Sequence, residues 1–282
     1  MADATRAHVW GNTATYDAYM GRWSRPVAEA VLAWLGLPPR RTWLDVGCGT
    51  GALTEAILAQ ADPREVFGVD PSAEFIVTAA QIVDPRVRFA VGDAGALPVP
   101  SDAYDTVIAG LVLHFVPDPP RAMREMVRAV RPGGTVAAYV WDFAGERQFT
   151  RYFWRAATAL DPAATAQDPI RQFPLGQPEP LAALFAGAGL QAVTVQAVVV
   201  PTVFRDFDDY WQPHLLGGSS PAQRYIASQG AGQRTALREQ LHAMLPIADD
   251  GSIPLLGHVW AVRGTKSASP RSGQICSKGC ST

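Results

Sequence analysis

The chain has 282 residues, of which 48% are hydrophobic, enough for one large α/β domain or for a domain with an insertion. Lys and Arg number 24 against 26 for Asp and Glu, so the net charge of -2 supplies no general field for binding nucleic acid or anionic membranes. No apolar run approaches the ~20 residues that span a bilayer, and the N-terminus lacks a signal-peptide core, so we expect a cytoplasmic protein.

Helical and strand patterns alternate through the first half of the chain. A helix is predicted from Ser24, which can cap it, to Gly36. Short apolar runs follow at regular distances, and they predict strands at Thr42–Val46, Glu65–Val69, Val87–Val91, Asp105–Gly110 and Thr135–Trp141. Because short buried strands that alternate with helices form parallel sheets, this half of the chain predicts an α/β fold.

The second half has a less regular pattern. Residues 161–177 are predicted to be a loop and residues 204–246 a mostly helical insertion. Residues 265–282 are small and polar and are predicted to be a disordered tail. Both lysines of the chain fall in this tail, so the folded part is expected to lack a lysine for Schiff-base or P-loop chemistry. The remaining elements are predicted at Phe149–Leu160 and Pro180–Ala188 (helices) and at Gln191–Val200 and Gly257–Arg263 (strands).

A glycine-rich segment, LDVGCGTG, joins the first predicted strand to the next helix. Its Gly47 and Gly49 allow a tight turn and a close approach of a ligand to the backbone. The spacing is G-x-G-x-G and lacks the sixth-position glycine of the dinucleotide fingerprint. Asp45 precedes the turn, and its carboxylate would repel a pyrophosphate and attract a cationic amino-acid group.

Two further carboxylates follow the next two strands. Asp70, beside Pro71, can accept hydrogen bonds from both hydroxyls of a ribose. Asp93 is placed to accept a hydrogen bond from an exocyclic adenine amine. Each of these acids alone is more often a helix cap or a turn residue. Their joint position at the carboxyl ends of consecutive strands favours a nucleoside site.

These motifs resemble those of class I S-adenosylmethionine (SAM)-dependent methyltransferases, especially a broad bacterial group with a variable helical lid. The resemblance covers about residues 12–265, and its strongest pieces are LDVGCGTG, GVDPS, GDAGALPVPSDAYD, LVLHFVPD and RPGG. It implies a Rossmann-like sheet of seven mostly parallel strands whose last strand runs antiparallel, with helical lid insertions. The cofactor that it implies is SAM.

The resemblance also assigns parts of the cofactor to residues. Gly47 and Gly49 would face the methionine part of SAM, and Asp45 would attract its cationic group. Gly110 and Leu111 would lie near the amino-acid end. The ribose and the adenine would meet Asp70, Pro71, Asp93 and Ala94.

One SAM-dependent methyltransferase domain is therefore expected over residues 1–264, with residues 265–282 as the tail. Its predicted parts are an N-terminal lid (10–36), a Rossmann-like core (40–141) and lid insertions at 142–177 and 204–246.

Two weaker sets of residues could complete the site. Tyr16 could close it, and Arg22 could pair with the SAM carboxylate; the alternative is a surface helix whose aromatic residues pack on the sheet. His114, four residues beyond the fourth strand, could be a general base near the methyl group, or it could cap a helix or support another residue.

The second half of the chain is rich in aromatic residues. Their helical spacing makes packing in the hydrophobic core the first explanation. Any of these aromatic side chains that line a pocket would suit an apolar or aromatic acceptor. No His, Cys and Asp spacing suggests a metal site. The aromatic residues concerned are Phe149, Tyr152, Phe153, Trp154, Phe204, Phe207, Tyr210 and Trp211.

The function expected from these observations is transfer of a methyl group from SAM to a small, apolar or aromatic molecule by in-line displacement. Neither nucleic acid nor membrane is expected as a partner, and the sequence leaves the oligomeric state open. Two alternatives remain, a methyltransferase acting on protein or RNA and a SAM-binding regulator without transferase activity.

Overall fold

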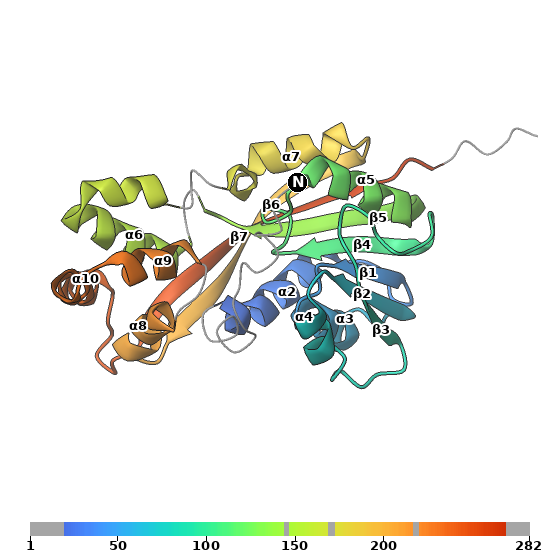
Figure 1. Ribbon diagram of the computed structural model, residues 1–282. Coiled ribbons are helices and arrows are strands. Elements are labelled where there is room, and N and C mark those ends of the chain that lie inside the picture. Colours follow the sequence, from blue (N-terminus) through green and yellow to red (C-terminus); the bar gives the residue numbers. More distant parts are fainter. Residues whose placement is uncertain (1–19, 144–146, 169–172, 217–219, 269–282) are drawn as a thin grey trace, which may run out of the picture.

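A single seven-stranded sheet forms the centre of the computed structural model, which describes residues 20–143, 147–168, 173–216 and 220–268 (Figure 1). The strand order is β3-β2-β1-β4-β5-β7-β6. β7 runs antiparallel to both of its neighbours, and the other neighbouring pairs are parallel, which confirms the predicted sheet. The strands are β1 (Thr42–Val46), β2 (Glu65–Asp70), β3 (Val87–Val91), β4 (Tyr104–Gly110), β5 (Val130–Trp141), β6 (Gln191–Phe204) and β7 (Ile253–Thr265).

Helices cover both faces of the sheet and make two hydrophobic cores. One core contains residues of α2, α3, α6, α8, α9 and α10. The other contains residues of α5 and α7, which pack on the opposite face of the sheet. The helices are α2 (Arg22–Leu35), α3 (Ala52–Gln60), α4 (Ala73–Ala79), α5 (Pro119–Ala129), α6 (Gln148–Leu160), α7 (Pro178–Gly187), α8 (Phe207–Leu215), α9 (Pro221–Ser228) and α10 (Ala231–Met244), with short 3-10 turns at Pro162–Gln167 and Pro174–Gly176.

The β6–β7 pair is longer than the sequence predicts. It continues past the end of β5 to the pair Phe204↔Ile253, and helices α8–α10 lie between the two strands in sequence (Figure 1). Pro201 and Pro254 lie inside this extension and suggest strand ends in the sequence. Both are tolerated because β6 is an edge strand and Pro254 lies beyond the part of β7 that pairs with β5.

The C-terminal boundary predicted at residue 265 is wrong. β7 includes Thr265, and Lys266 belongs to the fold, so the expectation of a folded part without lysine is also wrong. Residues 269–282 lie outside the described part of the chain. The Lys266 ammonium group donates three hydrogen bonds, to Asp102 Oδ1 (2.6 Å), the Val127 carbonyl (2.7 Å) and the Val130 carbonyl (2.9 Å).

Most of the aromatic residues of the second half are core residues. All of those singled out above are buried except Tyr152, which is half-buried. The Tyr210 hydroxyl donates to the Phe149 carbonyl at 2.7 Å and so joins α8 to the start of α6. Packing, the first explanation offered by their spacing, is therefore confirmed for the buried ones.

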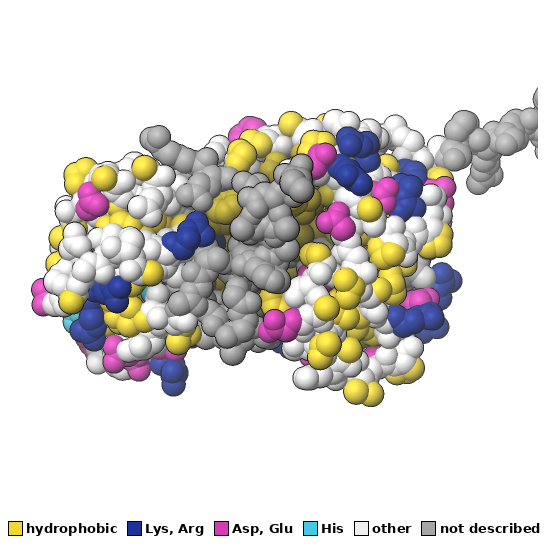
Figure 2. Space-filling view, in the orientation of Figure 1, with side chains coloured by type: hydrophobic (Ala, Val, Ile, Leu, Met, Phe, Trp, Pro, Cys, Tyr) yellow, Lys and Arg dark blue, Asp and Glu magenta, His cyan; other side chains and the backbone are white. Residues whose placement is uncertain are grey.

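The surface shown in Figure 2 carries positive and negative side chains interspersed rather than gathered in one patch. Within the described ranges, no helix has the length and apolar character needed to cross a membrane. The same residues contain no group of three or more His, Cys, Asp or Glu side chains that could hold a metal ion.

Candidate active site

The glycine turn after β1 is held against the end of β2. Gly47 and Gly49 have φ angles of 73° and 55°, in the left-handed region that favours glycine. A Cβ atom on Gly47 would lie 2.4 Å from Cγ2 of Val112, which brings the turn into contact with the segment after β4. A Cβ on Gly49 would meet no atom of the described residues within 4 Å. The backbone of Gly49 therefore faces open space that a ligand can occupy.

Asp70 joins this turn to the end of β2. Its Oδ2 accepts a hydrogen bond from the Gly49 amide at 3.0 Å, and its Oδ1 accepts one from the Ser72 amide at 2.8 Å. Burial raises the pKa of the Asp70 carboxyl. Because each carboxylate oxygen has a second lone pair, both can still accept hydrogen bonds from ribose hydroxyls. Pro71, which follows, is exposed.

Asp45 is a fully buried acid beneath the turn. Its Oδ2 accepts a hydrogen bond from the Thr54 hydroxyl at 2.8 Å, while Oδ1 has no hydrogen-bond partner among the described residues. Burial raises the pKa of Asp45 to about 7, and the charge of Asp70 adds to this effect. A buried acid with an unsatisfied oxygen is stabilised by a nearby cation. This property fits the ammonium group of an amino-acid ligand.

Gly110 is the last residue of β4, and Leu111 follows it; both lie against Tyr139. A Cβ on Gly110 would lie 2.4 Å from the Tyr139 hydroxyl, so only glycine fits there without a shift. Leu111 has a φ of 59°, a conformation that costs an L-residue about 1–2 kcal/mol. Its amide donates to the Tyr139 carbonyl at 2.8 Å, which holds the strained residue in place. Strain of this kind tends to occur at functional sites.

His114 lies in an aromatic cluster that the sequence did not predict. It is 9% exposed, and its ring centroid lies 3.9 Å from that of Phe115, 5.0 Å from Phe143 and 5.6 Å from Phe173. In the described part of the chain neither ring nitrogen has a hydrogen-bond partner, so the helix-capping alternative finds no support there. Burial, and secondly the charge of Arg147, lowers the pKa of His114 to about 3.

The N-terminal helix pairs with the second half of the chain. The two terminal nitrogens of Arg22 donate to the two carboxylate oxygens of Asp209 at 3.0 and 3.1 Å. Its guanidinium group also lies 4.4 Å from the ring centroid of Trp23 and 4.6 Å from that of Phe204. Trp23 is buried against Phe204, as the packing alternative predicts.

Arg22 therefore binds Asp209 in this structure and is not free for a cofactor carboxylate. The ion pair would have to open before Arg22 could meet SAM, so its assignment to the cofactor stays a prediction. Tyr16 lies outside the described residues. Asp93 and Ala94, by contrast, follow β3 as predicted, and Asp93 is exposed.

Comparison with known proteins identifies the family. A family profile described as "Methyltransferase domain" matches residues 44–138. Demethylmenaquinone methyltransferase from Lysinibacillus sphaericus is 33% identical over 178 residues, which cover 58% of this chain and 75% of that protein. The chain belongs to the class I SAM-dependent methyltransferases.

Two further comparisons bear on the extent of the likeness. Trans-aconitate 2-methyltransferase from Methylobacterium radiotolerans is 35% identical to this methyltransferase over 167 residues, 59% of this chain. The match spans 62% of that relative, less than two thirds of its length. The crystal structure of a protein from Bacillus halodurans, named as a candidate methyltransferase, has a TM-score of 0.56 at 15% identity and covers 86% of this chain and 99% of that one. This last likeness concerns the fold alone.

The cofactor of the methyltransferase is SAM, and the turn fits it in two respects. Gly49 borders open space, and the unsatisfied Asp45 oxygen lies in the same segment. The profile match runs from β1 to β5, which contain or border the predicted cofactor residues other than Tyr16 and Arg22. The second half of the methyltransferase lies outside the match.

Proposed function

We propose that this methyltransferase transfers the methyl group of SAM to a small, largely apolar molecule. The observation that carries the proposal is the buried imidazole of His114 among three phenylalanine rings, two residues from the Val112 contact with Gly47. Its nitrogens have no hydrogen-bond partner among the described residues. An apolar wall with one polar group suits an apolar acceptor that bears one polar atom.

When SAM is bound, its sulfonium supplies an already activated methyl carbon. The task of the protein is then to align the acceptor and to exclude water. The rings of Phe115, Phe143 and Phe173 would exclude water at the acceptor, and Asp45, Gly49 and Asp70 would hold the cofactor. No residue needs to form a bond with the methyl group.

His114 is better suited to orient the acceptor than to take its proton. An imidazole with a pKa of about 3 is neutral near pH 7 and accepts a proton poorly. It can still donate or accept a hydrogen bond through either nitrogen. We therefore propose hydrogen bonding to the polar atom of the acceptor in place of the general-base role predicted from the sequence.

The names of the relatives support a small acceptor. One is named for demethylmenaquinone and the other for trans-aconitate. The interspersed surface charges in Figure 2 give no support to an RNA acceptor. The cytoplasmic location expected from the sequence stays a prediction.

The proposal can be tested by calorimetry followed by a turnover assay. S-adenosylhomocysteine (SAH) should bind and NAD should not. Radiolabelled SAM should then transfer its methyl group to members of a panel of small phenols, quinols and carboxylic acids. Binding of SAH without transfer to any acceptor would favour the regulator alternative, and tight binding of NAD without SAH would overturn both.

Changing His114 to alanine should separate acceptor chemistry from cofactor binding. Loss of a buried hydrogen bond to the acceptor should lower single-turnover rates about 10–100-fold, with the affinity for SAH nearly unchanged. His242 is exposed and serves as the control. Changing it to alanine should alter neither the single-turnover rate nor the affinity for SAH.

The pH dependence gives a second readout of the same variant. Because the His114 pKa lies at about 3, the rate should show no His114 ionisation between about pH 5 and 8. A step in the rate near pH 6.5 that disappears in the alanine variant would restore the general-base role instead.

A further inference from the structure

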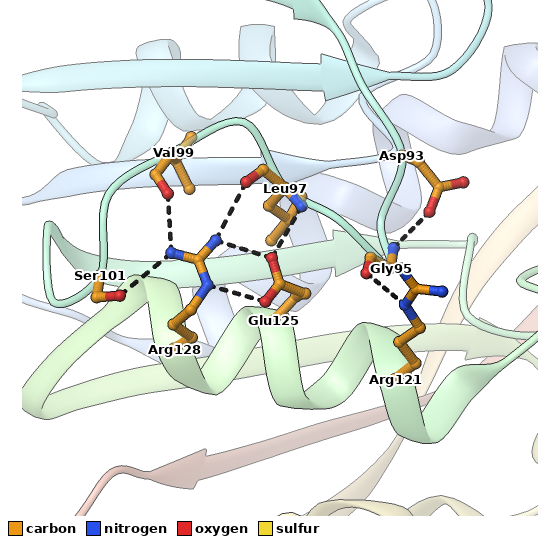
Figure 3. Close-up of polar contacts among 8 residues, drawn as sticks. All are labelled: Asp93, Gly95, Leu97, Val99, Ser101, Arg121, Glu125 and Arg128. Atoms are coloured by element: carbon orange, nitrogen blue, oxygen red, sulfur yellow. Dashed lines mark hydrogen bonds and ion pairs between the residues drawn. The ribbon is translucent and has the colours of Figure 1, made fainter.

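One face of α5 binds the loop between β3 and β4. Arg121, Glu125 and Arg128 are spaced four and three residues apart, so their side chains project from the same side of the helix (Figure 3). The carbonyls that the two arginines bind belong to every second residue of the loop. These bonds run from Arg121 Nε to Gly95 (2.7 Å), from Arg128 Nη2 to Leu97 (3.1 Å) and from Arg128 Nη1 to Val99 (2.8 Å).

On the C-terminal part of this face, Glu125 and Arg128 bind each other and the loop. Glu125 pairs with Arg128 through both of its carboxylate oxygens at 2.8 Å. One of these oxygens also accepts the Leu97 amide at 2.9 Å. Arg128 reaches Ser101 at 3.3 Å as well. Every charge in this network has a partner, and its effect is to fasten the loop to the helix.

Arg121 makes a different kind of contact. Its bond to Gly95 connects it to Asp93, the residue predicted to bind the adenine. The Gly95 amide donates to Asp93 Oδ1 at 2.7 Å, and the Gly95 carbonyl accepts from Arg121 Nε at 2.7 Å. A Cβ on Gly95 would lie 3.0 Å from Asp93 Oδ1 and 3.3 Å from Arg121 Nε. Gly95 is thus held between the two side chains, and its amide group sets the direction of the Asp93 carboxylate.

The other oxygen of Asp93 points away from the loop in Figure 3. No hydrogen bond to it is present in the described part of the chain, so it remains able to accept one from a ligand. The carboxylate cannot rotate freely while Gly95 holds Oδ1. Fixing one oxygen therefore fixes the direction of the other.

A groove of about 460 Å³ opens beside this contact, lined by Gly95, Ala96, Leu97, Arg121, Arg124 and Glu125. Arg121 is exposed there, so a small ion can reach its position from solvent. Arg124 lines the same groove one turn along the helix and, within the described ranges, forms no hydrogen bond or ion pair. It is therefore a matched control for charge at this surface.

We propose that Arg121 is a positioning residue that aims Asp93 at the exocyclic amine of the adenine. The inference rests on the proposed function, because it assumes that the protein binds SAM, and it takes Asp93 as the adenine ligand predicted from the sequence. Without Arg121 the Gly95 carbonyl loses its anchor, so the backbone on both sides of the Gly95 Cα can move and the carboxylate of Asp93 loses its fixed direction. The loss of affinity should be confined to ligands whose base carries an exocyclic amine where adenine does.

The test compares two ligands in calorimetry. Changing Arg121 to alanine should weaken SAH binding about tenfold, the effect of one charge-assisted hydrogen bond. S-inosylhomocysteine, in which a carbonyl replaces the exocyclic amine, should bind the wild type more weakly and lose nothing further in the variant. Arg124→Ala should bind both ligands as the wild type does.

Chemical rescue supplies a readout that a merely structural role would not give. Guanidinium chloride at about 20 mM, far below the molar range that unfolds proteins, should enter the groove and restore SAH binding to Arg121→Ala. Equal concentrations of sodium chloride should not. Arg128→Ala is the structural contrast, and it should lower the melting temperature without guanidinium rescue of binding.

The outcomes separate this inference from the function on which it rests. Failure of the wild type to bind SAH would contradict the proposed function. If the wild type binds, an unchanged affinity in Arg121→Ala, or an equal loss for both ligands, would overturn the role of Arg121. Gly95→Ala provides a second variant, because its Cβ would displace the same two side chains and should show the same preference between ligands.

Discussion

Replacing Gly49 by alanine is expected to weaken cofactor binding severely while costing only about 1–2 kcal/mol of folding stability. The φ angle of 55° penalises any side chain by about 1–2 kcal/mol, but the new methyl group would meet no atom within 4 Å in the part of the chain that the structure describes. It would instead fill the space in which the methionine part of SAM is predicted to lie. Calorimetry with SAH should show a loss of affinity of roughly 100-fold or more, about 3 kcal/mol.

Gly133 is the matched control for this change. It has a φ of 76° and equally open surroundings, and it lies at the start of β5, at the end of the sheet away from the glycine turn. Gly133→Ala should therefore lose a similar amount of stability in chemical denaturation and keep the wild-type affinity for SAH. Equal SAH affinities of the two variants would show that Gly49 does not border the cofactor.

Asp45→Asn should affect stability and cofactor affinity in opposite directions. The pKa of Asp45 is about 7 in the folded protein against 3.8 as the ordinary value, so the folded state binds a proton more tightly than the unfolded chain does. The stability that protonated Asp45 contributes is therefore fully present below about pH 4, and this contribution is lost as the pH rises toward 7. At about pH 8 the uncharged asparagine should raise the free energy of unfolding by an amount on the order of 4 kcal/mol.

The pH dependence of this gain identifies its cause. At about pH 5 the gain should be smaller by about 3 kcal/mol, because Asp45 is then protonated in the folded protein. SAH affinity should fall at least tenfold, since the asparagine cannot offer a charge to the ammonium group. Urea denaturation at the two pH values and calorimetry with SAH provide the measurements, and a gain that is equal at both pH values would show that ionisation of Asp45 is not the cause.

The sequence predicts the cofactor half of the molecule well because its signals are local. β1 and β3 have the predicted bounds, since each is a short run rich in β-forming residues that is followed directly by a glycine, Gly47 or Gly92. The carboxyl ends of such strands meet at one edge, so Asp70 and Gly49 could be expected to lie together before their hydrogen bond was seen.

The parts that escaped prediction depend on contacts between distant segments. Phe143 and Phe173 reach His114 from segments without periodicity, and no spacing in the sequence marks them. Arg22 and Asp209 are 187 residues apart, and the bond from Arg121 to Gly95 joins a side chain to a backbone carbonyl. Such contacts become visible only when the path of the whole chain is known.

The long β6–β7 hairpin has a consequence for how the sequence of this enzyme can diverge. Residues 205–252 leave and re-enter the sheet at a single pair of facing residues, Phe204↔Ile253, and the family profile stops at residue 138. The free energy of closing such a segment depends only weakly on its length. A segment of different length and composition can therefore replace it without moving the glycine turn or Asp70, provided that it covers the same apolar face. Residues 205–252 are in this sense an exchangeable module, and the aromatic cluster around His114, formed by Phe115, Phe143 and Phe173, lies outside it.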